Sequence, residues 1–87
     1  MALLSPKIIA QVSSRSAGKL GATSWEWIMR ADGQVLYRLT EMNGRRERNP
    51  WDPVTRVPAA ELQVIRGDKT KATEALDVIA RQYGHRR

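Results

Sequence analysis

Arginine and glutamine side chains alternate with apolar residues in the middle of this 87-residue chain. Arg30, Gln34 and Arg38 stand at positions that share one face of a β-hairpin, and Thr40 and Arg45 extend that face. Arginine forms paired hydrogen bonds with a guanine edge or a phosphate, and glutamine does so with an adenine edge. This pattern predicts a polar surface able to contact nucleic acid, although an ordinary solvated strand face has a similar composition.

Other basic residues are candidate phosphate contacts, and they fall in two short segments of the chain. They are Arg46, Arg48, Arg66, Lys69 and Lys71. The last two lie at the N-terminus of a predicted helix, where the helix dipole favours an anion. With a net charge of +6 and a pI near 10.5, the chain is expected to bind polyanions through counterion release.

A β-hairpin from Trp25 to Leu39 is the element that would position the polar face. Ala31-Asp32-Gly33 is predicted to be its three-residue loop, with Gly33 in a positive-φ conformation. The register places apolar residues opposite each other on one face and polar residues on the other. The pairs are Met29 with Val35, Trp27 with Tyr37, Trp25 with Leu39, Arg30 with Gln34 and Glu26 with Arg38. A shift of one residue would mix the two faces, so the pattern supports this register.

Asn43-Gly44 is a strong two-residue turn, and it predicts a third strand that starts at Arg45 and ends at Asn49-Pro50. Its predicted pairs are Glu41 with Arg46 and Met42 with Arg45. Residues 25–50 would then form a three-stranded antiparallel sheet.

Residues 51–67 are predicted to be a proline-containing loop. Within it, Ala59–Ile65 is either a helical turn or a further short strand, and its apolar residues are expected to reach the core. These residues are Leu62, Val64 and Ile65. Trp51 is interpreted as a lid on the core, with an exposed contact residue as the alternative.

Residues 1–24 are expected to form an N-terminal segment and a linker. Ser5-Pro6 is typical of a helix start and Gly18 of a helix end, which favours a short helix, although a short strand is an alternative. The segment 16–24 contains glycines and small polar residues, and a flexible connection is expected there.

The clearest element is a helix over 68–84, with Asp68 or Thr70 as its cap and Gly84 after its last apolar residue. Its apolar stripe consists of Ala72, Ala75, Leu76, Ile79, Ala80 and Tyr83. The stripe must be buried, and the apolar hairpin face is its best partner. The aromatic residues Trp25, Trp27 and Tyr37 are therefore predicted to be core, with a stacking surface for unpaired bases as the alternative.

Catalytic, metal and cofactor sites find no support in the sequence. Cysteine is absent, and the single histidine, His85, lies in a basic tail over 85–87. Gly18-Lys19-Leu20-Gly21 lacks the spacing of a phosphate-binding loop. No segment approaches the roughly 20 apolar residues that span a membrane, and a cytoplasmic protein with no enzymatic activity and no membrane partner is expected.

The order of a tryptophan strand, an Asp-Gly turn, a second strand and a helix opening with Thr-Lys-x-Ala resembles a known class. The chain is similar here to the AP2-like, arm-type DNA-binding domains of phage and mobile-element tyrosine integrases. The matching segments are 25–27, 32–35 and 70–75. The resemblance implies a sheet packed on the helix, with its other face, carrying Arg30, Gln34, Arg38 and Arg45, in the major groove of DNA.

We therefore expect a single α+β domain with a three-stranded antiparallel sheet packed on a C-terminal helix. Duplex DNA binding through the sheet face, in an accessory or regulatory role in a phage or mobile element, is the expected function. Double-stranded RNA binding is an alternative, because the order of elements is similar to that of double-stranded RNA-binding domains. A protein-protein interaction module, or a phage- or plasmid-encoded inhibitor of a host protein, is a third hypothesis that an exposed Trp51 would favour.

Overall fold

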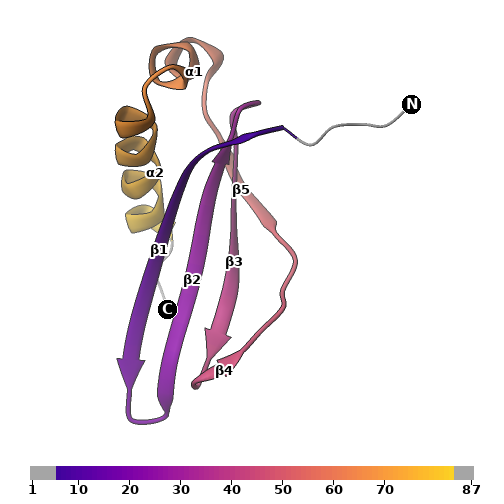
Figure 1. Cartoon of the computed structure of the whole chain (residues 1–87), viewed down its shortest axis with the longest axis vertical. Coiled ribbons are helices and arrows are strands. Elements are labelled where there is room, and N and C mark those ends of the chain that lie inside the picture. Colours follow the sequence, from indigo (N-terminus) through magenta and orange to yellow (C-terminus); the bar gives the residue numbers. More distant parts are fainter. Residues whose placement is uncertain (1–5, 84–87) are drawn as a thin grey trace, which may run out of the picture.

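Two long strands, β1 (Ile8–Gly18) and β2 (Gly21–Arg30), form a hairpin that runs along the length of the molecule (Figure 1). They belong to a computed structural model that describes residues 6–83. The remaining elements are β3 (Gln34–Met42), β4 (Arg45–Arg46), β5 (Asp52–Arg56), α1 (Ala59–Arg66) and α2 (Lys69–Tyr83). The five strands form one antiparallel sheet in the order β1-β2-β3-β4, with β5 also paired to β3. The α+β class is confirmed, and the sheet is larger than the three strands predicted.

Strand β1 replaces the predicted N-terminal helix and flexible connection, so both of those predictions are wrong. Ala10 pairs with Met29 and Val12 with Trp27, which places alternate β1 residues against the core. Such alternation has the period of a strand, and β-branched residues such as Ile8, Ile9 and Val12 favour that conformation over a helix. The pairing continues to Gly18 and Gly21, across a turn made by Lys19 and Leu20. Ser5, the proposed helix cap, lies outside the described residues.

The central hairpin between β2 and β3 has the predicted register. Met29 pairs with Val35, Trp27 with Tyr37, Glu26 with Arg38 and Trp25 with Leu39. The loop closes with the Gly33 N–H donating to the Arg30 carbonyl at 2.9 Å, and Gly33 has a φ of +91°. Turn chemistry and alternation together were therefore sufficient to predict this pairing.

The next hairpin, between β3 and β4, also follows the prediction. Asn43 and Gly44 both have positive φ values, 56° and 79°, as a two-residue turn of type I′ requires. Glu41 pairs with Arg46 and Met42 with Arg45. Strand β4 contains only these two arginines, so it is shorter than the predicted third strand.

The segment after β4 is more regular than the predicted loop over 51–67. Its first half is β5, which pairs with β3 through Gln34 and Arg56 and contains Pro53, a residue tolerated at a sheet edge. Its second half is α1, which buries Leu62 and Ile65. Val64 lies on the outer face of this helix and is 64% exposed, so the expectation that it reaches the core is wrong.

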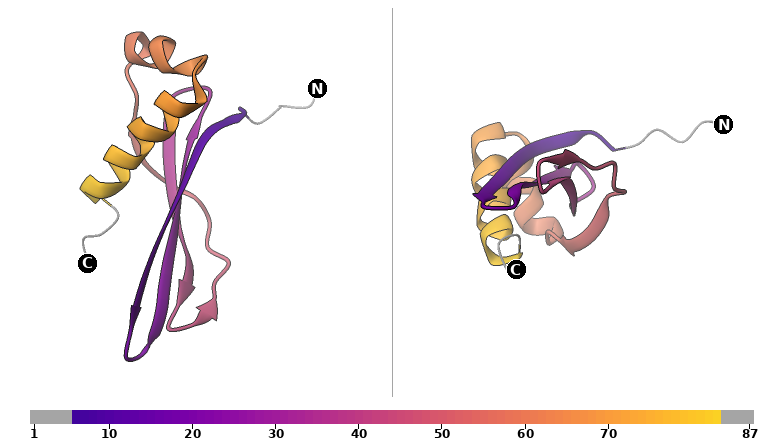
Figure 2. Two further views of the ribbon diagram at one scale, coloured as in Figure 1. Left: turned by 60° about the vertical axis from the view of Figure 1, so that its left-hand side comes forward. Right: turned by 90° about the horizontal axis from the view of Figure 1, so that it is seen from below.

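Helix α2 packs against β1 and β2 and covers one face at one end of the sheet (Figure 2). Ala72, Leu76 and Ala80 are its buried residues, and they join a core that contains Trp27 and Met29. As predicted, the Asp68 carboxylate accepts the backbone N–H groups of Thr70 and Lys71 and so caps the helix.

The aromatic residues of the hairpin belong to the core, as predicted. Trp27 is fully buried and stacks on Tyr37, with 5.0 Å between the ring centroids, and Trp25 packs against the same cluster. Tyr83, the last residue of the predicted apolar stripe, is instead half exposed, because it lies in the final turn of the helix. Gly84 and the tail over 85–87 lie outside the described residues. Neither α1 nor α2 is long and apolar enough to cross a membrane.

Candidate nucleic-acid interface

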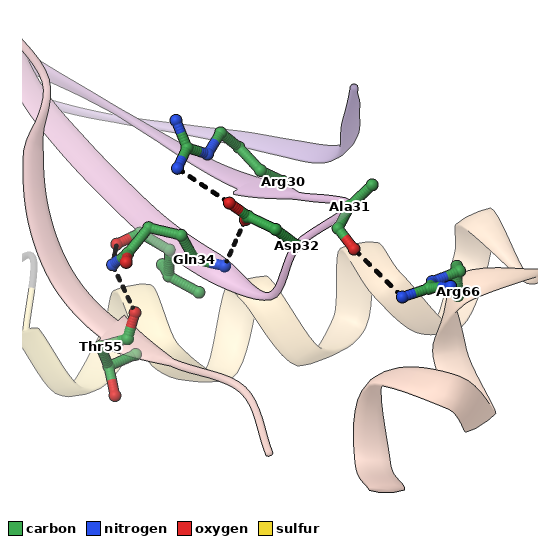
Figure 3. Close-up of polar contacts among 7 residues, drawn as sticks. Arg30, Ala31, Asp32, Gln34, Thr55 and Arg66 are labelled. Atoms are coloured by element: carbon green, nitrogen blue, oxygen red, sulfur yellow. Dashed lines mark hydrogen bonds and ion pairs between the residues drawn. The ribbon is translucent and has the colours of Figure 1, made fainter. Parts of the chain in front are cut away.

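The sheet face opposite α2 carries the residues first predicted to contact bases, and Arg30 is held there by an acid. One guanidinium nitrogen of Arg30 lies 3.0 Å from the Asp32 carboxylate (Figure 3). The other Asp32 oxygen accepts the backbone N–H of Gln34 at 2.9 Å. The loop acid thus orders both the turn and the arginine beside it.

The charge state of Asp32 makes this arrangement persistent. The Gln34 backbone N–H lowers the pKa of the carboxyl below its ordinary value of 3.8, and the Arg30 guanidinium contributes in the same direction. Arg56 of β5 adds a smaller attraction. Asp32 is therefore ionised at neutral pH and remains a partner for Arg30.

Gln34 is also engaged within the protein. Its side-chain amide donates to the backbone carbonyl of Thr55 in β5 at 2.9 Å (Figure 3). Strand β5 was predicted to be a loop, so the sequence offered no partner for this amide. To contact an adenine edge, Gln34 would first have to break this hydrogen bond.

Arg38 lies between an acid and an aromatic ring. Its guanidinium is 3.0 Å from Glu26, and its central carbon lies 4.2 Å from the centroid of the Trp51 ring. Gln11 of β1 donates to the second oxygen of Glu26 at 3.3 Å. Trp51 is half-buried and is not part of the apolar core cluster of the described residues, so the interpretation of it as a lid on the core is wrong.

The remainder of this face is also more covered than the sequence suggested. The Thr40 hydroxyl donates to the Ser24 carbonyl at 3.2 Å. Ile28 and Leu36, which lie between these polar residues on the same face, are 2% and 8% exposed. Arg30, Gln34, Arg38 and Thr40 thus share a face as predicted, but they are half-buried and have partners within the protein.

The cations without an acidic partner lie elsewhere, first at the end of the sheet that carries β4. Arg45, Arg46 and Arg48 are exposed, and none forms an ion pair with another described residue. The Gly44 N–H donates to the Ala22 carbonyl at 2.9 Å, which joins this end of β3 and β4 to the start of β2. Lys19 in the β1–β2 turn is exposed at the same end (Figure 1).

The second predicted group, Arg66, Lys69 and Lys71, lies at the opposite end of the molecule, where α1 meets α2 (Figure 1). Arg66 donates to the Ala31 carbonyl at 3.3 Å. The Asp68 carboxylate already occupies the N-terminal N–H groups of α2, the position proposed for an anion. The two basic groups lie toward opposite ends of the longest axis, along which the molecule extends 43 Å, so they do not form one surface (Figure 1).

Lys19 and the turn that carries it were not predicted to be part of a basic surface. The glycines at 18 and 21 were attributed to a flexible connection, whereas they flank a two-residue turn between paired strands. A glycine on each side of a Lys-Leu pair, between two segments of β-compatible residues, was the available indication of a hairpin.

Fold and charge together define a small basic α+β protein with an exposed cluster of arginines at one end of its sheet. Within residues 6–83, no group of acids or histidines could hold a metal ion. Comparison of the chain with protein-family models, with curated proteins and with solved structures finds no match.

Proposed function

We propose that this protein binds duplex nucleic acid, with DNA as the favoured form, through phosphate contacts at the β4 end of the sheet. The observation that carries the proposal is the group Arg45, Arg46 and Arg48, three exposed arginines with no ion pair among the described residues. An arginine without an acidic partner keeps its hydrogen-bond donors available for phosphate oxygens. We call these three residues the β4 arginines.

Phosphate contact is a better match to this geometry than base recognition through the sheet face. Arg30 and Arg38 would each have to leave a carboxylate at 3.0 Å before they could contact a guanine. Leaving that acid unpaired and half-buried would subtract from any energy gained at the base. Base reading of the kind implied by the AP2-like resemblance therefore requires a rearrangement, whereas phosphate contact by the β4 arginines does not.

The experiment is a binding titration against duplex DNA, duplex RNA and single-stranded DNA at several salt concentrations. One variant changes the β4 arginines to glutamine, and a matched variant changes Arg66, Lys69 and Lys71 to glutamine. Both remove three positive charges, but from opposite ends of the molecule. We expect the first variant to reduce the slope of log affinity against log salt by about three and the second to change it little.

Other outcomes of this titration would contradict the proposal. Equal effects of the two variants would show that charge acts without a defined surface. A larger effect of the second variant would place the interface at the α1–α2 junction. Binding that does not depend on salt would exclude phosphate contacts as its source, and would favour a protein partner.

A further inference from the structure

Half of the β1–β2 hairpin extends beyond the part of the sheet that α2 covers (Figure 2). From Arg15 to Gly21 every residue is exposed, and the nearest members of the core cluster and its packed neighbours are Val12 and Trp25. We call the paired segments 15–24 the arm. Ala22 is the one buried residue of the arm, so packing in the core accounts for little of its length.

The arm is thin, because its side chains are small on both faces. Apart from Arg15, Lys19 and Leu20, its residues are serine, alanine, glycine and threonine: Ser16, Ala17, Gly18, Gly21, Ala22, Thr23 and Ser24. The β3–β4 turn lies beside β2 as far as Gly21, so the Lys19-Leu20 turn is the part of the arm that projects alone. Small side chains on either side of this turn let the backbone approach a duplex closely.

Leu20 forms the tip of the arm and is 84% exposed, more than any other large hydrophobic residue of the described chain. A hairpin turn is usually occupied by glycine, asparagine or aspartate, so a leucine is unexpected there. Its neighbour Lys19 is a cation, and the β4 arginines lie at the same end of the sheet. The tip is therefore an exposed apolar residue beside a cation, at the end of the sheet that carries the β4 arginines.

The arm is braced against the β3–β4 turn, which fixes the tip relative to the β4 arginines. Gly21 has a φ of +122°, and a Cβ added there would lie 2.5 Å from the backbone carbon of Asn43. Glu41 of β3 accepts a hydrogen bond from Ser24 at 3.1 Å and lies 3.8 Å from Arg15. The two hairpins thus pack as one unit, and only a glycine fits at their closest approach.

We propose that the tip of the arm enters the minor groove of duplex DNA, places Leu20 against one base step and bends the duplex, while the β4 arginines contact the flanking phosphates. This inference rests on the proposed function and adds the geometry of binding. Apolar side chains that wedge between base pairs unstack them and kink the duplex. One leucine is enough for such a wedge, whereas binding to a lipid surface needs a larger apolar area than this tip offers.

The test measures affinity and bending with the full chain and a duplex of random sequence that carries a donor and an acceptor dye at its ends. Leu20→Ser removes the wedge without changing charge, and Val64→Ser is the control, since Val64 is also exposed but lies on α1. We expect Leu20→Ser to abolish the protein-dependent change in energy transfer and to weaken binding about tenfold, with an unchanged salt slope. Val64→Ser should behave like the unmodified protein.

The outcomes separate this inference from the proposed function. If Leu20→Ser bends the duplex as the unmodified protein does, the wedge is wrong, although salt-dependent binding through the β4 arginines would still stand. If no duplex is bound, both proposals fail. Leu20-dependent binding to vesicles of phosphatidylserine and phosphatidylcholine, without duplex binding, would instead assign the arm to an anionic lipid surface. Unchanged unfolding midpoints for both variants would show that the fold is intact.

Discussion

The two ends of the sheet are formed by the same strands but differ in burial and in side-chain size, and β2 shows both differences along its length. Near its C-terminal end, Trp27 and Met29 are fully buried beneath α2. Near its start, residues 21–24 are small and carry no large apolar side chain. Burial of large apolar surface stabilises the covered end, so truncating a core side chain there should cost more stability than a substitution in the arm.

Charge follows the same division. On the opposite face of the covered part of the sheet, Arg30 and Arg38 each lie 3.0 Å from an acid. At the arm end, Arg15 lies 3.8 Å from Glu41, whereas Lys19, Arg45 and Arg46 have no ion pair with another described residue. The position of a basic residue in the chain therefore did not indicate whether its side chain is free to bind a ligand. The acids that pair with Arg30 and Arg38 lie in the adjacent loop and on the neighbouring strand.

The largest expected effect is on the core of the covered end. Trp27→Ala should lower the free energy of unfolding by about 3–5 kcal/mol, because it leaves a cavity between Tyr37 and α2. Chemical denaturation followed by circular dichroism measures this. A loss below about 1 kcal/mol would contradict the conclusion that burial beneath α2 supplies most of the stability of the domain.

At the arm end, a backbone substitution should have a smaller and more local effect. Gly21→Ala should cost about 1–3 kcal/mol, because its φ is +122° and its Cβ would meet the Asn43 backbone. Gly18→Ala is the matched control on the other side of the turn, where nothing lies within 4 Å of an added Cβ. Hydrogen exchange should show faster opening of the arm in Gly21→Ala alone, with protection of α2 retained.

Removing the charge of Asp32 tests the ion pair of the covered part of the sheet. Asp32→Asn should lower stability at pH 7 by about 0.5–1 kcal/mol, since the pair with Arg30 is partly solvated. The folded-state pKa of Asp32 lies below 3.8, so its contribution is present above that value and is lost as pH falls through the folded pKa. The unmodified protein and the variant should therefore converge in stability at acid pH, and a constant difference down to pH 2 would contradict this.

Arg38→Lys should change stability about as little as Asp32→Asn does and should leave duplex affinity unchanged, so it compares the two surfaces directly. Lysine loses the planar contact with Trp51 and the fork toward Glu26, which should cost about 1 kcal/mol of stability. Duplex affinity should not change, because this arginine is engaged within the protein. An affinity loss of about 1–3 kcal/mol on a preferred sequence would instead restore base reading by the sheet face.

Local patterns in the sequence were sufficient for the elements whose partners are close along the chain. The alternation from Trp25 to Leu39 and the Asn43-Gly44 turn predicted three paired strands with correct registers. Asp68 and the apolar spacing after it predicted α2. In each case a turn or a cap and the hydrophobic period act over a few residues and agree, so no distant contact is needed to choose the structure.

Tertiary structure decided the elements whose local preference was weak or whose partner is distant. The segment 8–18 is compatible with a helix or a strand, and its pairing with β2 makes it a strand. A proline-containing segment became β5 because β3 had an unpaired edge, and that strand then supplied the partner of Gln34. Trp51 contacts the Arg38 guanidinium on the sheet face opposite α2 and is not part of the apolar core cluster of the described residues. Composition and local patterns thus determined the class, the charge and the central hairpin, which also contains the acids beside Arg30 and Arg38. Only the tertiary structure decided the partner of Gln34 and the ring beside Arg38, because both depend on how the segment after β4 packs on the sheet.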